Sequence, residues 1–185
     1  MALAEHLYDY ISEYLGSYSG NYLEIGVFNG DGFARIASRY TNKHCYAIDP
    51  FIEDGYTSGT SSVAQGHILN TQKSSFFNLT QNLNNITHYE VTSAKFFNEL
   101  TDAQIDAMNI SVVLIDGSHH YDDVVTDYQL SMRLLKKQSS GLVIFDDLHV
   151  PDVHKAYVEF IDLYSERIHN SGLIGGNSNF VKIKL

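Results

Sequence analysis

The chain has 185 residues, of which 44% are hydrophobic and 18% charged, a balance typical of one globular domain. Its formal net charge of -10, from 12 basic and 22 acidic residues, argues against a nucleic-acid partner, because phosphate binding needs a Lys/Arg-rich surface. The acidic excess is equally compatible with a role in solubility alone. A single cysteine, Cys45, excludes an internal disulfide.

The sequence carries no signal for export or for a membrane. No basic-plus-apolar leader opens the chain, and no apolar run reaches the length of a membrane span. We therefore expect a cytoplasmic protein with no membrane partner.

The N-terminal half is expected to alternate helices with short buried strands. Apolar residues at helical spacing predict an amphipathic helix over 2–15; with the loop after it, this makes an N-terminal segment (1–20) ahead of a main domain over 21–185. Tyr10 and Tyr14 form, with Leu7, a stripe that we assign to the core; the alternatives are a substrate mouth or a homodimer contact. In chain order there follow a buried strand over 22–26, a helix over 31–39 and a strand over 44–48.

The C-terminal half continues the same alternation after a glycine- and serine-rich stretch over 53–66. That stretch lacks apolar periodicity, which is typical of a lid or binding loop, or of a plain surface loop. The elements expected after it are a helix over 68–83, a strand over 87–91, a helix over 94–100, a strand over 110–115, a helix over 122–136, a strand over 141–145, a helix over 151–168 and closing strands over 172–174 and 180–185. The alternation predicts a single α/β domain with a doubly wound, mostly parallel sheet.

The first strand runs into a glycine turn, Glu24-Ile25-Gly26-Val27-Phe28-Asn29-Gly30-Asp31-Gly32. Glycines allow a tight turn and a close approach of the backbone to a ligand. The spacing matches neither the dinucleotide fingerprint nor a P-loop, which disfavours pyrophosphate binding. Asp49 ends the next strand, where a carboxylate can accept both hydroxyls of an unphosphorylated ribose. Together they indicate a nucleoside-like cofactor; the alternative is a plain strand–helix turn beside an exposed aspartate.

Three carboxylates follow the fourth and fifth strands of the predicted sheet, namely Asp116, Asp146 and Asp147. Ligands of open α/β sheets bind at the carboxyl ends of the strands, so these side chains should converge. Mg²⁺ needs only one or two carboxylates plus waters and substrate. A cation there could bind a substrate hydroxyl and lower its pKa. The alternative is that Asp147 caps a helix or faces water.

Histidines cluster around the same strand ends. His119 or His120, just after Asp116, could serve as the general base, since histidine titrates near neutrality. Together with His149 and His154, these histidines could also form a Zn²⁺ or Fe²⁺ site, although no paired Cys/His spacing appears. For each histidine the alternative is a structural hydrogen bond.

Taken together, these motifs resemble class I S-adenosylmethionine-dependent methyltransferases. The most similar branch is that of the small-molecule O-methyltransferases related to macrocin O-methyltransferase and to the rhamnosyl and cephalosporin-biosynthesis proteins. The resemblance extends from about Tyr22 to the end and is carried by Glu24-Ile25-Gly26 with Gly30, Ile48-Asp49-Pro50-Phe51, Ile115-Asp116-Gly117-Ser118-His119-His120-Tyr121, and Gly141 with Phe145-Asp146-Asp147.

The resemblance implies a Rossmann-like sheet of seven strands with the last one antiparallel. Gly26 and Gly30 would border the methionine end of S-adenosylmethionine, and Asp116 would double as a base. The implied cofactor-binding set is Glu24, Gly26, Gly30, Asp49, Phe51, Ser93 and Asp116, with Glu24 supporting the turn, Asp49 on the ribose, and Phe51 and Ser93 near adenine. The implied metal set is Asp116, Asp146 and Asp147.

We therefore expect a Mg²⁺-assisted O-methyltransferase that uses S-adenosylmethionine and acts on a hydroxyl of a small molecule. One alternative is a protein that binds S-adenosylmethionine or adenosylhomocysteine without chemistry. The other is a metal-dependent hydrolase or oxygenase that uses the Asp/His cluster.

Overall fold

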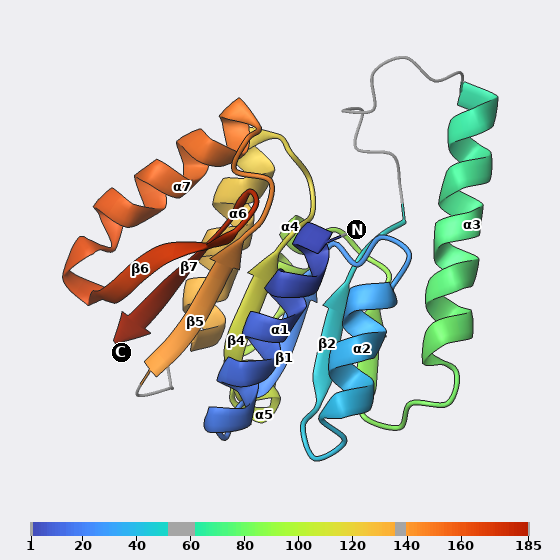
Figure 1. Ribbon diagram of the computed structural model, residues 1–185, viewed down its shortest axis with the longest axis horizontal. Helices are drawn as coiled ribbons and strands as arrows, with labels where there is room; N and C mark the ends of the chain where they lie inside the picture. The colour runs from blue at the N-terminus through green and yellow to red at the C-terminus, as the bar shows by residue number, and fades with distance from the viewer. Residues whose placement is uncertain (1, 52–61, 136–139, 185) are drawn as a thin grey trace.

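A single seven-stranded sheet organises the protein, with strands in the order β3-β2-β1-β4-β5-β7-β6 (Figure 1). The computed structural model describes the backbone of residues 2–51, 62–135 and 140–184, and the side chains of 6–51, 71–135 and 140–184. The strands are β1 (Asn21–Ile25), β2 (Cys45–Ile48), β3 (Ile86–Tyr89), β4 (Ile110–Ile115), β5 (Ser140–Phe145), β6 (Ile168–Gly175) and β7 (Ser178–Lys184). The first five are parallel, and β7 pairs antiparallel with both β5 and β6, which confirms the predicted fold class and the antiparallel last strand.

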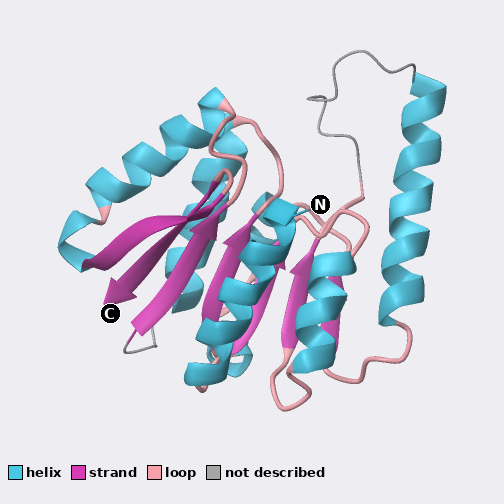
Figure 2. Ribbon diagram, in the orientation of Figure 1, coloured by secondary structure: helices cyan, strands magenta, loops and turns pink. Residues whose placement is uncertain are grey.

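Helices cover both faces of the sheet (Figure 2). Those described are α1 (Ala2–Ser17), α2 (Asp31–Arg39), α3 (Ser62–Thr80), α4 (Ser93–Glu99), α5 (Asp102–Met108), α6 (Tyr121–Leu135) and α7 (Pro151–Leu163). The α1 and α2 helices pack on one face, while α4 to α7 pack on the other. The α3 helix stands beside α2, at the end of the sheet opposite β6 (Figure 1). No described helix has both the length and the apolar run that a membrane crossing requires.

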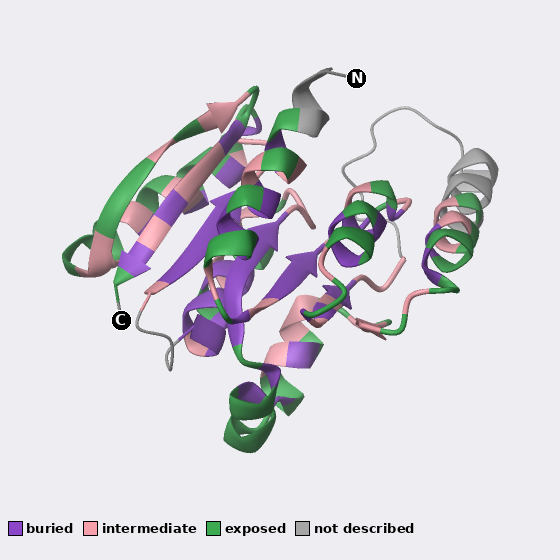
Figure 3. Cartoon of the chain, turned by 60° about the horizontal axis from the view of Figure 1, so that its bottom comes forward, coloured by how far each residue is buried: buried purple, intermediate pink, exposed green. Residues whose placement is uncertain are grey.

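The central strands are buried on both faces, as parallel strands between two helical layers must be. All six residues of β4 are buried. Successive side chains of β1 alternate between the two cores, with Leu23 and Ile25 on the side of α4 to α7 and Tyr22 on the side of α1 and α2. Figure 3 shows the resulting concentration of buried residues in the sheet.

The N-terminal helix belongs to the second of these cores. Leu7 is buried and Tyr14 is 7% exposed, while half-buried Tyr10 stacks on Phe180 of β7 with ring centroids 5.2 Å apart. The assignment of this stripe to the core is therefore confirmed.

The main differences from the sequence-based expectation are two element boundaries and one additional helix. Most of the predicted 53–66 loop lies outside the described residues, but its end is helical, because α3 begins at Ser62. The last long helix stops at Leu163 rather than near 168, and a 3₁₀ turn leads directly into β6 at Ile168. The short helix α5 was not predicted; it begins with a capping box between Thr101 and Gln104.

Candidate functional site

The predicted functional residues line up along the carboxyl edge of the sheet. Ile25 of β1 is paired in register with Ile48 of β2 and with Ile115 of β4, and Ile115 is paired with Phe145 of β5. The ladder continues for one more residue, since the backbone N–H of Asp116 donates to the Ile25 carbonyl at 2.9 Å. The residues that come next on these four neighbouring strands, Asp49, Gly26, Asp116 and Asp146, therefore form one row.

The glycine turn depends on both of its predicted glycines. Gly26 has a φ of 81°, and a Cβ added there would lie 2.1 Å from the carbonyl oxygen of Asp116. Gly30, the N-cap residue of α2, has a φ of 87°, and a Cβ there would lie 2.8 Å from the ring of Phe76. Both positions combine left-handed backbone with close packing, so only glycine fits without strain.

Asp49 holds this turn against the end of β2. Its Oδ2 accepts hydrogen bonds from the backbone N–H groups of Val27 at 2.8 Å and Phe28 at 3.2 Å, and its Oδ1 accepts one from Phe51 at 2.7 Å. A carboxylate offers about four acceptor positions, so the predicted ribose contact remains chemically open. The sequence did not indicate that the same carboxylate fixes the shape of the turn.

The two residues expected near adenine follow the neighbouring strands β2 and β3. The ring of Phe51 packs on Phe76, Phe77 and His88, with centroids 5.7, 6.4 and 5.3 Å away. Ser93, the first residue of α4, hydrogen-bonds through its side chain to Asp127 of α6. An aromatic surface and a hydroxyl therefore stand at the β2–β3 end of the row.

Carboxylates dominate the electrostatics of the row. Burial raises the pKa of Asp116 well above its usual range, and the charges of Asp146, Glu24, Asp147 and Asp49 raise it further. Burial also raises the pKa of Glu24, to about 7, against the lowering effect of two phenol hydrogen bonds, from Tyr22 at 2.6 Å and Tyr8 at 3.1 Å. The charged groups that most affect the pKa of Asp116 among the described residues are thus all acids, and such a site favours a cationic ligand.

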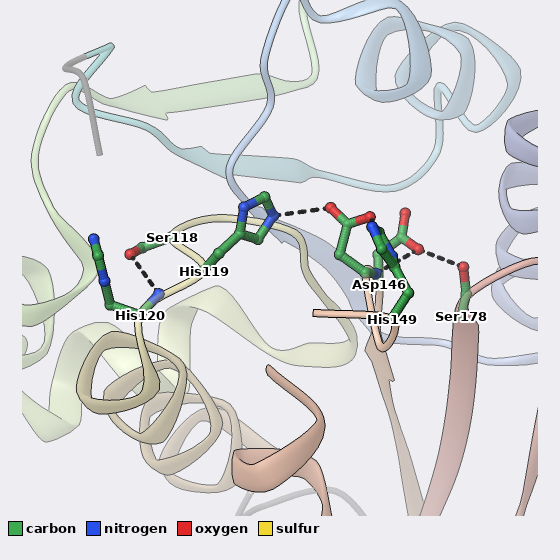
Figure 4. Close-up of polar contacts among 7 residues, drawn as sticks. Ser118, His119, His120, Asp146, His149 and Ser178 are labelled. Atoms are coloured by element: carbon green, nitrogen blue, oxygen red, sulfur yellow. Dashed lines mark hydrogen bonds and ion pairs between the residues drawn. The ribbon is translucent and has the colours of Figure 1, made fainter. Parts of the chain in front are cut away.

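The aspartate pair after β5 is held by different partners (Figure 4). Oδ1 of Asp146 accepts from the hydroxyl of Ser178 at 2.6 Å and from the backbone N–H of Asp147 at 2.8 Å. Asp147, at a φ of 55°, contacts Nε2 of His119 at 2.9 Å through Oδ2 and Nδ1 of His149 at 3.5 Å through Oδ1. The hydrogen bond from His119 lowers the pKa of Asp147, which favours an ionised carboxylate next to an imidazole.

Of the three candidate bases, the two histidines differ in position. His119 joins the aspartate pair, whereas His120 is exposed and its backbone N–H donates to the Ser118 hydroxyl at 3.2 Å (Figure 4). The third candidate, Asp116, lies between these groups and the glycine turn in the row. The geometry therefore favours His119 over His120 as a base that acts at this edge.

The predicted metal ligands fit a hard cation in their chemistry. Asp116 and the Asp146–Asp147 pair supply oxygen donors from adjacent strands, and a cation would relieve the repulsion that raises the pKa of Asp116. Among the residues that the structure describes, no group of three or more His, Cys, Asp or Glu side chains is arranged to hold a metal ion. The magnesium assignment stays a prediction in which water and substrate complete the coordination.

Sequence reasoning missed Tyr8, which reaches Glu24 from α1, and Asp127, which reaches Ser93 from α6. Asp127 is 1% exposed and could have been found, because it occupies a helical position in line with the buried Val124 and Ser131. No comparable signal marks Tyr8, whose contact depends on how α1 packs against the turn.

Comparison with known proteins gives one family match. A family model described as a methyltransferase domain matches residues 23–148. A curated relative, an uncharacterized protein of Acanthamoeba polyphaga mimivirus, is 28% identical over 127 residues, which are 68% of this chain and 50% of that protein. The chain thus spans about half the length of the curated relative that it matches.

Solved structures with the same fold include several described as O-methyltransferases. A putative caffeoyl-CoA O-methyltransferase from Staphylococcus aureus aligns with a TM-score of 0.65 at 17% identity, covering 97% of this chain and 83% of that one. The O-methyltransferase NovP aligns at 0.64 and 13% identity over 98% and 79%, and the TDP-rhamnose 3'-O-methyltransferase CalS11 at 0.60 and 14% identity over 97% and 78%. At these identities the likeness shows the fold alone, and the macrocin and cephalosporin branch stays a prediction.

Proposed function

This chain belongs to the methyltransferase domain family, and on that premise we propose that it is an S-adenosylmethionine-dependent O-methyltransferase acting on a hydroxyl of a small molecule with the help of Mg²⁺. The observation that carries the proposal is the row formed by the glycine turn, Asp49, Asp116 and the Asp146–Asp147 pair at one edge of the sheet. A sugar or polyketide-like acceptor is the substrate class that we favour.

The charge of the row supports a sulfonium donor. S-adenosylmethionine carries a positive sulfonium, and the charged groups that most raise the pKa of Asp116 are four carboxylates from three segments of the chain. The glycine turn allows the donor to approach the backbone closely, and Asp49 supplies acceptors for ribose hydroxyls. The adenine would lie beyond the ribose, towards Phe51 and Ser93.

His119 is the residue that we assign to proton removal. The contact between Asp147 and Nε2 orients the imidazole. The carboxylate would also stabilise the imidazolium that forms when His119 takes the hydroxyl proton. When bound to Asp116, Asp146 and Asp147, Mg²⁺ would supply Lewis-acid polarisation of the acceptor oxygen.

The positioning of donor and acceptor relative to each other supplies most of the expected acceleration of methyl transfer. The acceptor oxygen must lie in line with the sulfonium–methyl bond, and holding two reactants in such a geometry can be worth roughly 7–11 kcal/mol. The chain's contribution is a rigid platform, because the row follows the ends of four buried strands.

The test combines calorimetry with a screen of hydroxylated acceptors, with adenosylhomocysteine formation measured in the presence of Mg²⁺ or of chelator. We expect Asp146→Asn and Asp147→Asn to lose metal-dependent turnover and still to bind adenosylhomocysteine. Asp162→Asn, on the exposed side of α7, is the matched control and should turn over normally.

The other outcomes separate the alternatives. Normal turnover of both variants with chelator present would show that the metal role is wrong. Binding of adenosylhomocysteine with no product from any acceptor would favour a protein that holds the nucleoside without chemistry. A thermal shift with Zn²⁺ or Fe²⁺ and none with the nucleoside would favour a metal-dependent hydrolase or oxygenase.

A further inference from the structure

Tyr8 of α1 packs against the end of the glycine turn, where α2 begins on the same face of the sheet. Its ring covers the start of α2 so closely that a Cβ added at Gly32 would lie 1.8 Å from its Cζ. Its hydroxyl donates to Oε1 of Glu24, which is 1% exposed, at 3.1 Å. The contact with Glu24 fixes the direction of the phenol hydrogen.

The phenol oxygen lies in the field of the carboxylate row. Burial and the charges of Glu24, Asp116 and Asp146 all raise the pKa of Tyr8 far above its ordinary value, so the hydroxyl keeps its proton. Because that proton is given to Glu24, the lone pairs of the phenol oxygen can act only as acceptors towards another group. An acceptor surrounded by carboxylates fits an ammonium and repels an anion.

The strand order indicates which part of S-adenosylmethionine, the methyl donor, would reach Tyr8. The sheet runs β3-β2-β1-β4-β5, with Phe51 and Ser93 following β2 and β3 and Asp49 at the end of β2. A donor with adenine beside Phe51 and ribose on Asp49 must extend its amino-acid portion across β1 towards β4 and β5. Asp116 and Asp146, whose charges act on Tyr8, follow those two strands.

We propose that Tyr8 binds the α-ammonium of the donor's amino-acid portion, with its phenol oxygen accepting from the ammonium while its hydroxyl donates to Glu24. This inference rests on the proposed function, because it takes the donor to be a sulfonium amino acid joined to a nucleoside. It gives α1 a role in ligand recognition in addition to its role in the core.

The experiment measures the affinities of three ligands by calorimetry. Adenosylhomocysteine has the full amino acid, its desamino analogue keeps the carboxylate and lacks the ammonium, and 5'-methylthioadenosine lacks the whole amino-acid portion. Tyr8→Phe keeps the ring and removes the oxygen. Tyr10→Phe is the matched control, because Tyr10 lies on the same helix and stacks on Phe180.

We expect Tyr8→Phe to weaken adenosylhomocysteine binding about 10- to 100-fold, the usual effect of losing a hydrogen bond to a charged group. Its affinity for the desamino analogue and for methylthioadenosine should stay within about twofold of the wild type. Tyr10→Phe should bind all three ligands as the wild type does. This pattern would isolate the contact to the ammonium, because the two other ligands lack that group.

Three results would overturn the inference. If Tyr8→Phe binds adenosylhomocysteine normally, or weakens all three ligands equally, Tyr8 does not recognise the ammonium. If Tyr8→Phe does not fold, the affinities of the wild type still test the inference. Equal binding of adenosylhomocysteine and its desamino analogue by the wild type would refute the contact. Failure of the wild type to bind any of the three nucleosides would remove the proposed function as well, and so is distinguishable from the first two results.

Discussion

Asp49 combines a predicted role in ligand binding with an observed role in the local fold. The sequence placed it at a strand end and predicted a ribose contact. The structure shows in addition that both of its oxygens accept backbone hydrogen bonds, from Val27, Phe28 and Phe51. The predicted ribose contact and the observed shape of the turn therefore involve the same carboxylate.

These two roles predict that Asp49→Asn changes both the stability of the protein and its binding of adenosylhomocysteine. An amide has one acceptor oxygen, and its NH₂ group would face backbone donors, so at least one part-buried donor loses its partner. Each such loss costs about 1–3 kcal/mol. We expect a lower urea midpoint with an unchanged slope, together with weaker binding of adenosylhomocysteine. Asp162→Asn should match the wild type in both measurements, and an Asp49→Asn protein with wild-type stability would refute the bracing role.

Residues at strand ends could be predicted, whereas residues that join the site from another layer could not. Asp116 and Asp146 are found by reading where an apolar run stops, because parallel strands end at the same edge. Tyr8 enters through the angle at which α1 crosses the glycine turn, and that angle is set by packing between layers. No spacing in the sequence encodes such a contact.

At the scale of elements, the glycine turn joins the strand ladder to α2. Gly26 is the tightest point, since its missing Cβ would lie 2.1 Å from the carbonyl of Asp116 and its φ is 81°. The obstacle is backbone of the neighbouring strand end, which cannot rotate away as a side chain could. The turn and the end of β4 therefore fit each other as one unit.

Gly26→Ala should consequently destabilise the protein by about 1–3 kcal/mol or more, from overpacking added to left-handed strain. It should also weaken adenosylhomocysteine binding, because the turn would have to move away from Asp116. Gly16→Ala is the comparison, since Gly16 lies in α1, has no positive φ, and would meet only the hydroxyl end of Tyr40 at 3.3 Å. Urea unfolding of the two variants would test this, and equal effects would contradict the argument.

The sequence predicts the central elements well and the last elements poorly, for a physical reason. The strands β4 and β5 are continuous apolar runs because both of their faces are buried. The strand β6 lies at the edge of the sheet, and its segment IHNSGLIG shows no simple alternation, so the helix before it was extended too far. Helix α5 has seven residues, too short for a periodic pattern to stand out.

At the scale of the whole molecule, the fold buries acids on both sides of the sheet. Glu24 lies towards α1 and Asp127 lies on α6 in the other layer, and each is 1% exposed. Burial raises the pKa of each to about 7. One oxygen of Asp127, Oδ1, has no hydrogen-bond partner, so its ionised form is poorly compensated.

These two groups make stability fall as the pH rises. Between the ordinary carboxyl pKa near 4 and the folded value of about 7, the folded state keeps protons that the unfolded state has released. The unfolded state then binds fewer protons, so the free energy of unfolding decreases with pH across this window and levels off above it. Below about pH 4 both states are protonated, and neither group changes the stability.

Asp127→Asn should remove one of these two contributions. The amide has no charge to desolvate and can still bond to Ser93, so the variant should gain stability relative to the wild type between pH 5 and pH 8. Each pKa unit corresponds to about 1.4 kcal/mol, which makes the relative gain on the order of a few kcal/mol. Urea unfolding at both pH values measures it, with Asp122→Asn, an exposed position on the same helix, as the control that should keep the wild-type pH dependence. An Asp127→Asn protein whose stability changes with pH as steeply as that of the wild type would mean that this carboxyl is already ionised in the folded state and does not contribute to the pH dependence of the fold.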